Sequence, residues 1–248
     1  MIPKERVLEK LDSLLRANDY PAAKRLLKYW LSEAEYERDF HGVLLMQNEL
    51  MGLCRKLGEK EEALSFAQNA LDQVKKMDIE NDVGAATTYL NSATVLKAFG
   101  RSEDALPLFQ KAKNIYERSL SSADDRLAGL YNNMALALVD LKNFRQATEL
   151  YQEAISVLES VPGKEPEMAI TYLNMASAQE AEHGLLEAKE EIFTLCEKAM
   201  ACMEAGKERT DGNYAFVCEK CASVFAFYGY EDYAKKLKER YGRIYDGT

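Results

Sequence analysis

Three asparagines recur at nearly constant intervals in the middle of the chain. Asn91, Asn133 and Asn174 are 42 and 41 residues apart. An asparagine amide donates hydrogen bonds through its nitrogen and accepts them through its oxygen, so a row of them can pair with successive peptide groups of an extended chain. Asparagine is a poor helix former, so its repetition within predicted helices indicates a role beyond folding. The alternative is that these amides bond only within or between helices.

Polar residues close to this row complete a candidate peptide-binding set. Some lie three residues after a member of the row, on about the same helical face. Others lie one register position before the row, or further along the same predicted helices, where they would provide side-chain selectivity. Besides the asparagine row, the candidates are Asn48, Asn132, Thr94, Ser177, Arg55 and Lys97.

The other residue types that could do chemistry form no recognisable catalytic or metal-binding motif. The pair Cys218-x2-Cys221 would need two more ligands to hold zinc, and His41 and His183 are both far away in sequence. The two cysteines occupy register positions that pack in other repeats, so we predict that they are core residues. We therefore expect no catalytic residue, no metal and no cofactor, and we expect that the chain is not an enzyme.

Composition excludes several classes of protein and partner. The chain has 248 residues, of which 47% are apolar, and 32 Lys+Arg against 41 Asp+Glu give a net charge of −9. This apolar content excludes a disordered chain, and the acidic balance argues against a nucleic-acid partner. No window is apolar enough to cross a membrane, and the charged first residues do not resemble a signal peptide. Five cysteines, an odd number, favour reduced thiols. We expect a cytoplasmic protein without a membrane partner.

The asparagines belong to an internal repeat. Thr88–Ala93, Leu130–Ala135 and Thr171–Ala176 align with one another, and an alanine follows the tyrosine of each segment after 16 residues. Weaker copies extend the register in both directions. The key alanines are Ala23, Ala63, Ala105, Ala147, Ala188 and Ala234. The predicted units are roughly residues 3–38, 39–80, 81–122, 123–164, 165–209 and 210–248, within a single domain 1–248.

Each unit is predicted to form two helices joined by a short turn. Apolar residues recur with helical spacing, as in Tyr131, Met134, Ala135 and Leu138. The small alanines allow two antiparallel helices to approach closely. Glycine recurs at one register position between the helices, where a left-handed backbone is favoured. The sequence therefore predicts an all-α fold.

This pattern resembles the tetratricopeptide repeat. The matching residues are Tyr131-x2-Met134-Ala135-x2-Leu138, followed by Ala147-x3-Tyr151. The period of about 42 residues is similar to the long-repeat subclass found in kinesin light chains and bacterial peptide receptors. The resemblance implies a right-handed superhelical solenoid of about six antiparallel helix pairs, with the first helix of each pair lining a concave groove.

Two functions and one assembly are compatible with this reading. The first is a non-catalytic scaffold that binds a protein or an extended peptide segment in its groove. The alternative is a cytoplasmic receptor for a short signalling peptide that regulates a protein target. A homodimer through the aromatic C-terminal end is a further hypothesis, against which internal packing is favoured. The aromatic residues concerned are Phe225, Phe227, Tyr228, Tyr230, Tyr233, Tyr241 and Tyr245.

Overall fold

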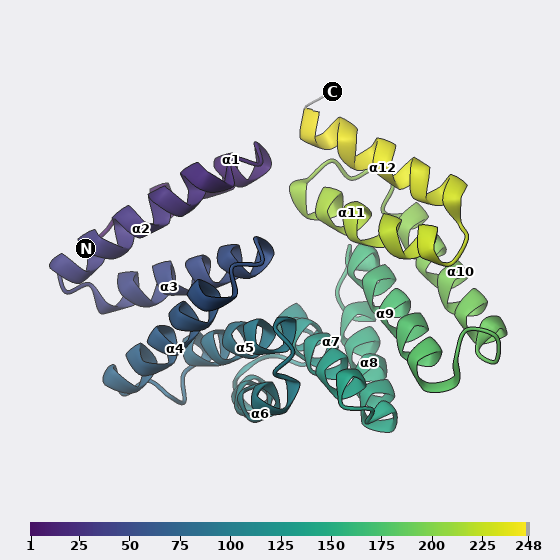
Figure 1. Cartoon of the computed structure of the whole chain (residues 1–248), viewed down its shortest axis with the longest axis horizontal. Helices are drawn as coiled ribbons and strands as arrows, with labels where there is room; N and C mark the ends of the chain where they lie inside the picture. Colours follow the sequence, from purple (N-terminus) through teal and green to yellow (C-terminus); the bar gives the residue numbers. More distant parts are fainter. Residues whose placement is uncertain (247–248) are drawn as a thin grey trace. The chain divides into compact units, whose positions relative to one another are not determined.

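The computed structural model describes residues 1–246, and within them the only regular secondary structure is helical. Twelve helices follow one another along the described chain (Figure 1). They are α1 (Lys4–Arg16), α2 (Tyr20–Tyr36), α3 (Phe40–Lys56), α4 (Lys60–Lys76), α5 (Val83–Ala98), α6 (Ser102–Ser119), α7 (Asp125–Asp140), α8 (Phe144–Glu159), α9 (Glu165–His183), α10 (Lys189–Ala205), α11 (Gly212–Phe227) and α12 (Glu231–Asp246). The all-α prediction is confirmed.

The helices form six consecutive pairs, one in each predicted repeat. The pairs α1–α2, α3–α4, α5–α6, α7–α8, α9–α10 and α11–α12 all pack together. Neighbouring pairs also contact one another, because α2 packs on α3, α4 on α5 and α8 on α9. The first helices of successive pairs meet as well, α3 with α5 and α9 with both α7 and α11. This arrangement is the stacked helix-pair architecture of a solenoid.

Small residues let the two helices of a pair approach closely. Ala23, Ala63, Ala105 and Ala147 are fully buried, each at the fourth position of its helix. In the fifth repeat, the predicted position of the key alanine is wrong by four residues relative to the second helix. Ala188 precedes α10, and Ile192 takes the fourth position of that helix. The cause is α9, which continues to His183 and leaves a five-residue turn instead of a three-residue one.

A residue with positive φ follows the first helix of every pair. These residues are Asn18, Gly58, Gly100, Lys142, Gly184 and Gly229, with φ between 54° and 85°. In the five pairs other than that of Gly184, the following amide reaches back to the helix, as when Glu59 N donates to the Cys54 carbonyl at 2.9 Å. This geometry satisfies carbonyls that the helix end leaves free, and glycine adopts it without a steric penalty.

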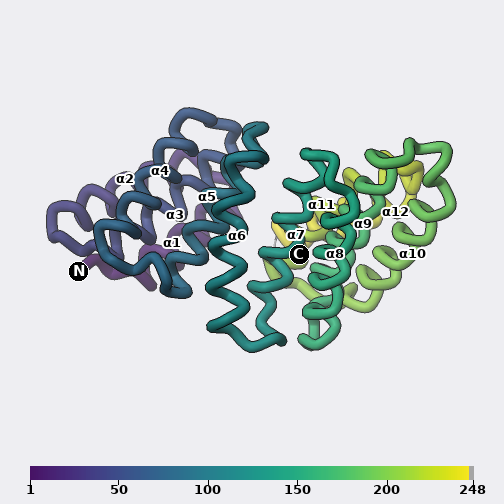
Figure 2. The backbone as a smooth tube through the Cα atoms, turned by 90° about the horizontal axis from the view of Figure 1, so that it is seen from below, coloured from purple at the N-terminus to yellow at the C-terminus, as the bar shows by residue number. Residues whose placement is uncertain are grey.

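The chain comprises two compact units, Met1–Leu120 and Ser121–Thr248. Each holds three helix pairs, whose helices stack side by side within the unit (Figure 2). Each also has its own apolar core. Leu27, Met46 and Leu50 are fully buried in the first unit, and Tyr214 and Phe225 are fully buried in the second. The single continuous domain stays a prediction.

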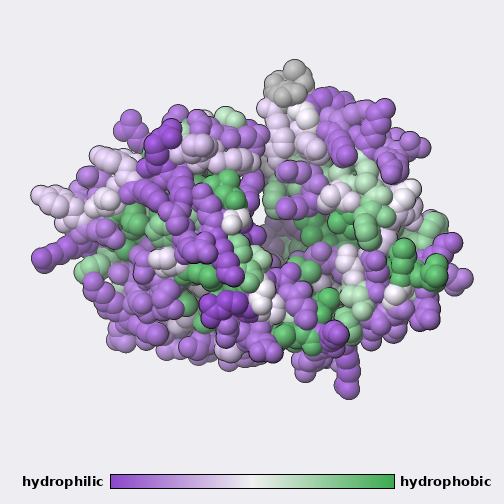
Figure 3. Space-filling model, in the orientation of Figure 1, coloured by the Kyte–Doolittle hydropathy of each residue, from purple (hydrophilic) through white to green (hydrophobic). Residues whose placement is uncertain are grey.

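Figure 3 shows a largely hydrophilic face of the molecule on which apolar side chains emerge in separate patches. Of the helices that the structure describes, none combines the length and apolar character needed to cross a bilayer.

Candidate functional site

All nine predicted peptide-binding residues lie on first helices of their pairs. Asn48 and Arg55 lie on α3; Asn91, Thr94 and Lys97 on α5; Asn132 and Asn133 on α7; Asn174 and Ser177 on α9. The fully buried Ala93, Ala135 and Ala176, two residues after each member of the row, fix this register. The asparagines themselves are half-buried. Five candidates belong to the first unit and four to the second.

In the first unit, two of the asparagines form a pair across neighbouring repeats. Asn91 Nδ2 donates to Asn48 Oδ1 at 2.9 Å, so α5 is joined to α3 by an amide–amide hydrogen bond. Asn48 Nδ2 in turn donates to Thr88 Oγ1 at 3.1 Å and to the Leu44 carbonyl at 2.9 Å. The amide of Asn48 is therefore held in one orientation by three partners.

The second unit repeats this pair in the same register. Asn174 Nδ2 donates to Asn132 Oδ1 at 3.0 Å and so joins α9 to α7. In both units the donor belongs to the asparagine row, and the acceptor lies one register position earlier in the preceding repeat. We call Asn48–Asn91 and Asn132–Asn174 the amide pairs. The sequence left open that the asparagine amides bond between helices. Both amide pairs form such a bond.

Asn133 behaves differently from the other two members of the row. Its Nδ2 donates to the Gly129 carbonyl of its own helix at 2.8 Å. A short polar side chain within a helix can bond to the carbonyl four residues earlier, and Asn133 does so.

The amide pairs do not exhaust the hydrogen-bonding capacity of the row. An asparagine offers two N–H donors and an oxygen with two lone pairs. Among the described residues, Asn91 and Asn174 each use one donor, and the side-chain oxygen of each accepts nothing. With half-exposed side chains, both can still donate one hydrogen bond and accept another from a bound molecule.

The flanking candidates surround the amide pairs with further polar groups. Thr94 Oγ1 donates to the Leu90 carbonyl at 2.8 Å, and Ser177 Oγ donates to the Leu173 carbonyl at 3.2 Å. Arg55 is exposed at the end of α3, and Lys97 is half-buried near the end of α5. In the second unit the Tyr228 hydroxyl donates to Glu180 at 2.9 Å and lies 3.4 Å from Ser177 Oγ. The cationic candidates thus belong to the first unit alone.

The tyrosines of the repeat motif pack rather than stand free. Tyr89 and Tyr131 are buried, and Tyr172 is half-buried beneath the Lys198 ammonium, 5.6 Å from the ring centre.

The aromatic C-terminal end is also largely internal, because Phe225 is fully buried and packs edge-on against Tyr233. Phe227 is 66% exposed. Self-association through this end stays a prediction.

Cys218 and Cys221 are core residues, as the sequence predicted. Both are buried in the second unit. Burial raises the pKa of the Cys218 thiol to about 11 and raises that of Cys221 as well, so neither is a thiolate near neutral pH. His41 and His183 are exposed on different helices.

Sequence reasoning missed one charged cluster in the first unit. Cys54, Glu59 and Glu62 present oxygen and sulfur atoms within 4.8 Å of one another. The Lys24 ammonium of α2 donates to Glu59 at 2.7 Å and also to Glu62, and Lys28 contacts Glu62 at 2.8 Å. The carboxylates therefore serve an ion-pair network between α2 and the start of α4. In the sequence, the available signal for this ion-pair network was that its lysines and glutamates are separated by nearly one repeat length.

Comparison with known proteins identifies the repeats. Family models described as tetratricopeptide repeat match residues 43–118 and 127–165. The clustered mitochondria protein homolog of Debaryomyces hansenii is 28% identical over 113 residues, which are 46% of this chain and 8% of that protein. The chain thus spans under a tenth of that curated relative.

Solved structures share the fold at low sequence identity. BtubC (BKLC) from P. vanneervenii superposes with a TM-score of 0.68 at 20% identity, over 81% of this chain and 80% of that one. A putative kinesin light chain from Podosopora anserina with nearly identical repeats gives 0.56 at 17% identity, over 81% and 94%. Residues 43–118 and 127–165 are therefore tetratricopeptide repeats. The likeness to BtubC and to the kinesin light chain repeats is one of fold.

Proposed function

We propose that each of the two units binds an extended segment of a partner protein along the first helices of its repeats, through its own amide pair. Tetratricopeptide repeats indicate a protein-interaction scaffold. The observation that carries the finer proposal is the spare donor and acceptor on Asn91 and on Asn174, in the same register of two units.

The chemistry suits a peptide backbone. An extended segment presents an N–H and a C=O at every residue, whatever its side chains. One amide can donate to a backbone carbonyl and accept from a backbone N–H at once. Recognition by this route tolerates many sequences, and side-chain selectivity then falls to neighbours such as Arg55 and Ser177.

The amide pairs also lower the cost of binding. A free asparagine side chain loses rotamer freedom when it contacts a ligand, at roughly 0.5–1.5 kcal/mol for each immobilised side chain. Asn91 and Asn174 are already oriented by their hydrogen bonds to the preceding repeat. Most of this loss has therefore occurred on folding, which favours binding.

A selection experiment tests the proposal without a known partner. A display library of random twelve-residue peptides is panned against the full chain, and the affinity of selected peptides is measured by calorimetry. In the double variant Asn91→Ala, Asn174→Ala each unit loses the spare donor and the spare acceptor of its amide pair. Binding should weaken about tenfold or more, since each lost hydrogen bond contributes about 1 kcal/mol.

The matched control is Asn69→Ala, which removes an exposed asparagine from the second helix α4. It should leave the affinity unchanged, and all variants should keep the helical circular-dichroism spectrum. If selected peptides bind the double variant as tightly as the native chain, the amide pairs are structural only and the proposal is wrong.

A further inference from the structure

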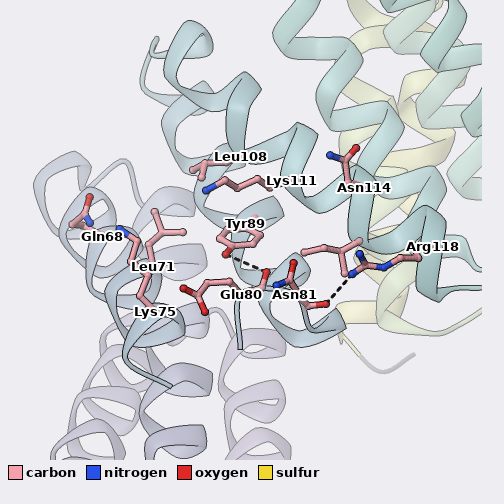
Figure 4. A pocket seen from close by; sticks show the side chains of 11 residues that line it. Gln68, Leu71, Lys75, Glu80, Asn81, Tyr89, Leu108, Lys111, Asn114 and Arg118 are labelled. Carbon is pink, nitrogen blue, oxygen red and sulfur yellow. Dashed lines mark hydrogen bonds between the residues drawn. The ribbon is translucent and has the colours of Figure 1, made fainter. Parts of the chain in front are cut away.

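A pocket of about 630 Å³ lies in the first unit, away from the amide pairs. It is formed by α4, α6 and the segment before α5, so it belongs mainly to the second helices of the second and third repeats (Figure 4). Tyr89 of α5 lies at its centre, and its hydroxyl donates to the Glu80 carbonyl at 3.4 Å. The volume is within the range of ligand-binding clefts.

The pocket is basic although the chain is acidic. Lys75, Lys111 and Arg118 line it, against a single carboxylate from Glu80. Among the described residues, none of these cations makes an ion pair. Lys111 Nζ lies 5.5 Å from the centre of the Tyr89 ring, and Arg118 donates only to the Asn81 carbonyl at 3.4 Å.

These cations differ from others in the same unit. Lys24 and Lys28 contact glutamates, and Arg101 contacts Asp104 at 2.8 Å. In a chain with a net charge of −9, carboxylates are abundant enough to pair every cation. Three unpaired cations around one pocket therefore leave a positive potential that favours an anionic partner.

The apolar part of the pocket restricts the partner further. Leu71, Leu108 and Ile115 line it beside the Tyr89 ring. Figure 4 shows the three cationic side chains spaced around Tyr89 rather than directed at one point. A small inorganic anion would meet one or two of them, whereas a peptide can place an apolar side chain against the half-buried Leu71 and Leu108 and carboxylates on either side.

We propose that this pocket binds an acidic segment of a partner protein in which carboxylates flank an apolar residue. The site is separate from the amide pairs, so it does not depend on the function proposed above. The amide donors of Gln68 and Asn114 at its rim suit the backbone carbonyls of such a segment.

Fluorescence anisotropy with the full chain tests this proposal. The probe is a labelled peptide with a central leucine between two glutamates on each side, and its isosteric control carries glutamines instead. The native chain should bind the acidic probe at least tenfold more tightly than the glutamine peptide, and added salt should weaken binding because exposed charges are screened. Lys111→Glu and Arg118→Glu should each weaken it about tenfold.

The matched control is Lys60→Glu, the same change of charge at an exposed position of α4 outside the pocket. It should change the affinity less than twofold. Four results would overturn the proposal: no binding of the probe at about 1 mM, equal binding of the glutamine peptide, equal loss in Lys60→Glu, or displacement by equimolar phosphate or single-stranded RNA.

Discussion

At the residue scale, one side chain can serve two partners. Asn91 and Asn174 each hold the preceding repeat with one N–H while the opposite side of the amide remains available. The sequence predicted the row because the repeat period places these residues in register. It could not predict the pairing, because the acceptors lie one position off the row, and only the stagger between neighbouring helices brings the amides within 3.0 Å.

The amide pair of the first unit should be measurable as a coupling energy. In a double-mutant cycle of Asn48→Ala and Asn91→Ala, the free energies of unfolding should be non-additive by about 1 kcal/mol, because each single variant already removes the shared hydrogen bond. Urea denaturation followed by circular dichroism measures it. Full additivity would mean that the two side chains act independently in solution.

The glutamate that bonds to two lysines should give the first unit a stability that depends on pH. Hydrogen bonds from Lys24 and Lys28 lower the pKa of Glu62 from 4.5 to about 2. A pKa that is lower in the folded than in the unfolded state stabilises the fold above the unfolded value, and this stabilisation is lost as the pH falls from about 4.5 towards 2. Since the side chain of Glu62 is 40% exposed, solvent screening limits the effect.

Glu62→Gln should therefore lower the free energy of unfolding by up to about 1 kcal/mol at neutral pH. The difference from the native chain should shrink as the pH is lowered to 3, as chemical denaturation would show. Glu61→Gln, at an exposed neighbour that forms no ion pair with any residue in 1–246, is the control and should have little effect at either pH. A difference that is constant with pH would contradict the ionic origin.

At the element scale, the helix pairs follow from turn chemistry as much as from apolar periodicity. The recurring glycines predicted left-handed turns, and Gly58, Gly100 and Gly229 adopt them. Asn18 and Lys142 adopt the same backbone without being glycine, because the helix end needs its carbonyls satisfied. The shift of the fifth repeat escaped prediction because the 16-residue spacing to Ala188 persists, although α9 continues to His183 and α10 begins only after Ala188.

This turn geometry predicts a stabilising substitution. Lys142 has φ 59° and is exposed, so Lys142→Gly should relieve a left-handed strain of roughly 1–2 kcal/mol and cost roughly 0.5–1 kcal/mol of chain entropy. The net gain expected is about 0.5 kcal/mol or slightly more. The reciprocal change Gly100→Lys should destabilise by a similar amount. Thermal melts of both variants measure the effect, and a destabilised Lys142→Gly would refute it.

At the scale of the whole molecule, the repeat pattern is continuous while the packing is not. The sequence shows the same motif before and after residue 120, so periodicity alone gives no reason to divide the chain there. The structure groups the first three pairs and the last three into separate compact units, because each encloses its own core. Contacts between residues distant in sequence decide this division, and a repeat motif does not encode them.

Residues 1–120 and 121–248 should therefore fold when they are expressed separately. Each fragment keeps three stacked pairs, the number that a repeat array needs for stability. We expect a helical circular-dichroism spectrum and a cooperative melt for each. A break after Lys76, which separates α4 from α5 within the first unit, is the control and should give unfolded or aggregating fragments. Equal behaviour of both sets would contradict the division.

The Asn48–Asn91 hydrogen bond has a mechanical consequence. A load that parts α3 from α5 stretches this 2.9 Å contact, so the Asn91 amide regains its rotation as the stack is pulled. Under the proposed function, tension along the first unit would weaken the binding of an extended segment, and an occupied unit would resist extension more stiffly than an empty one.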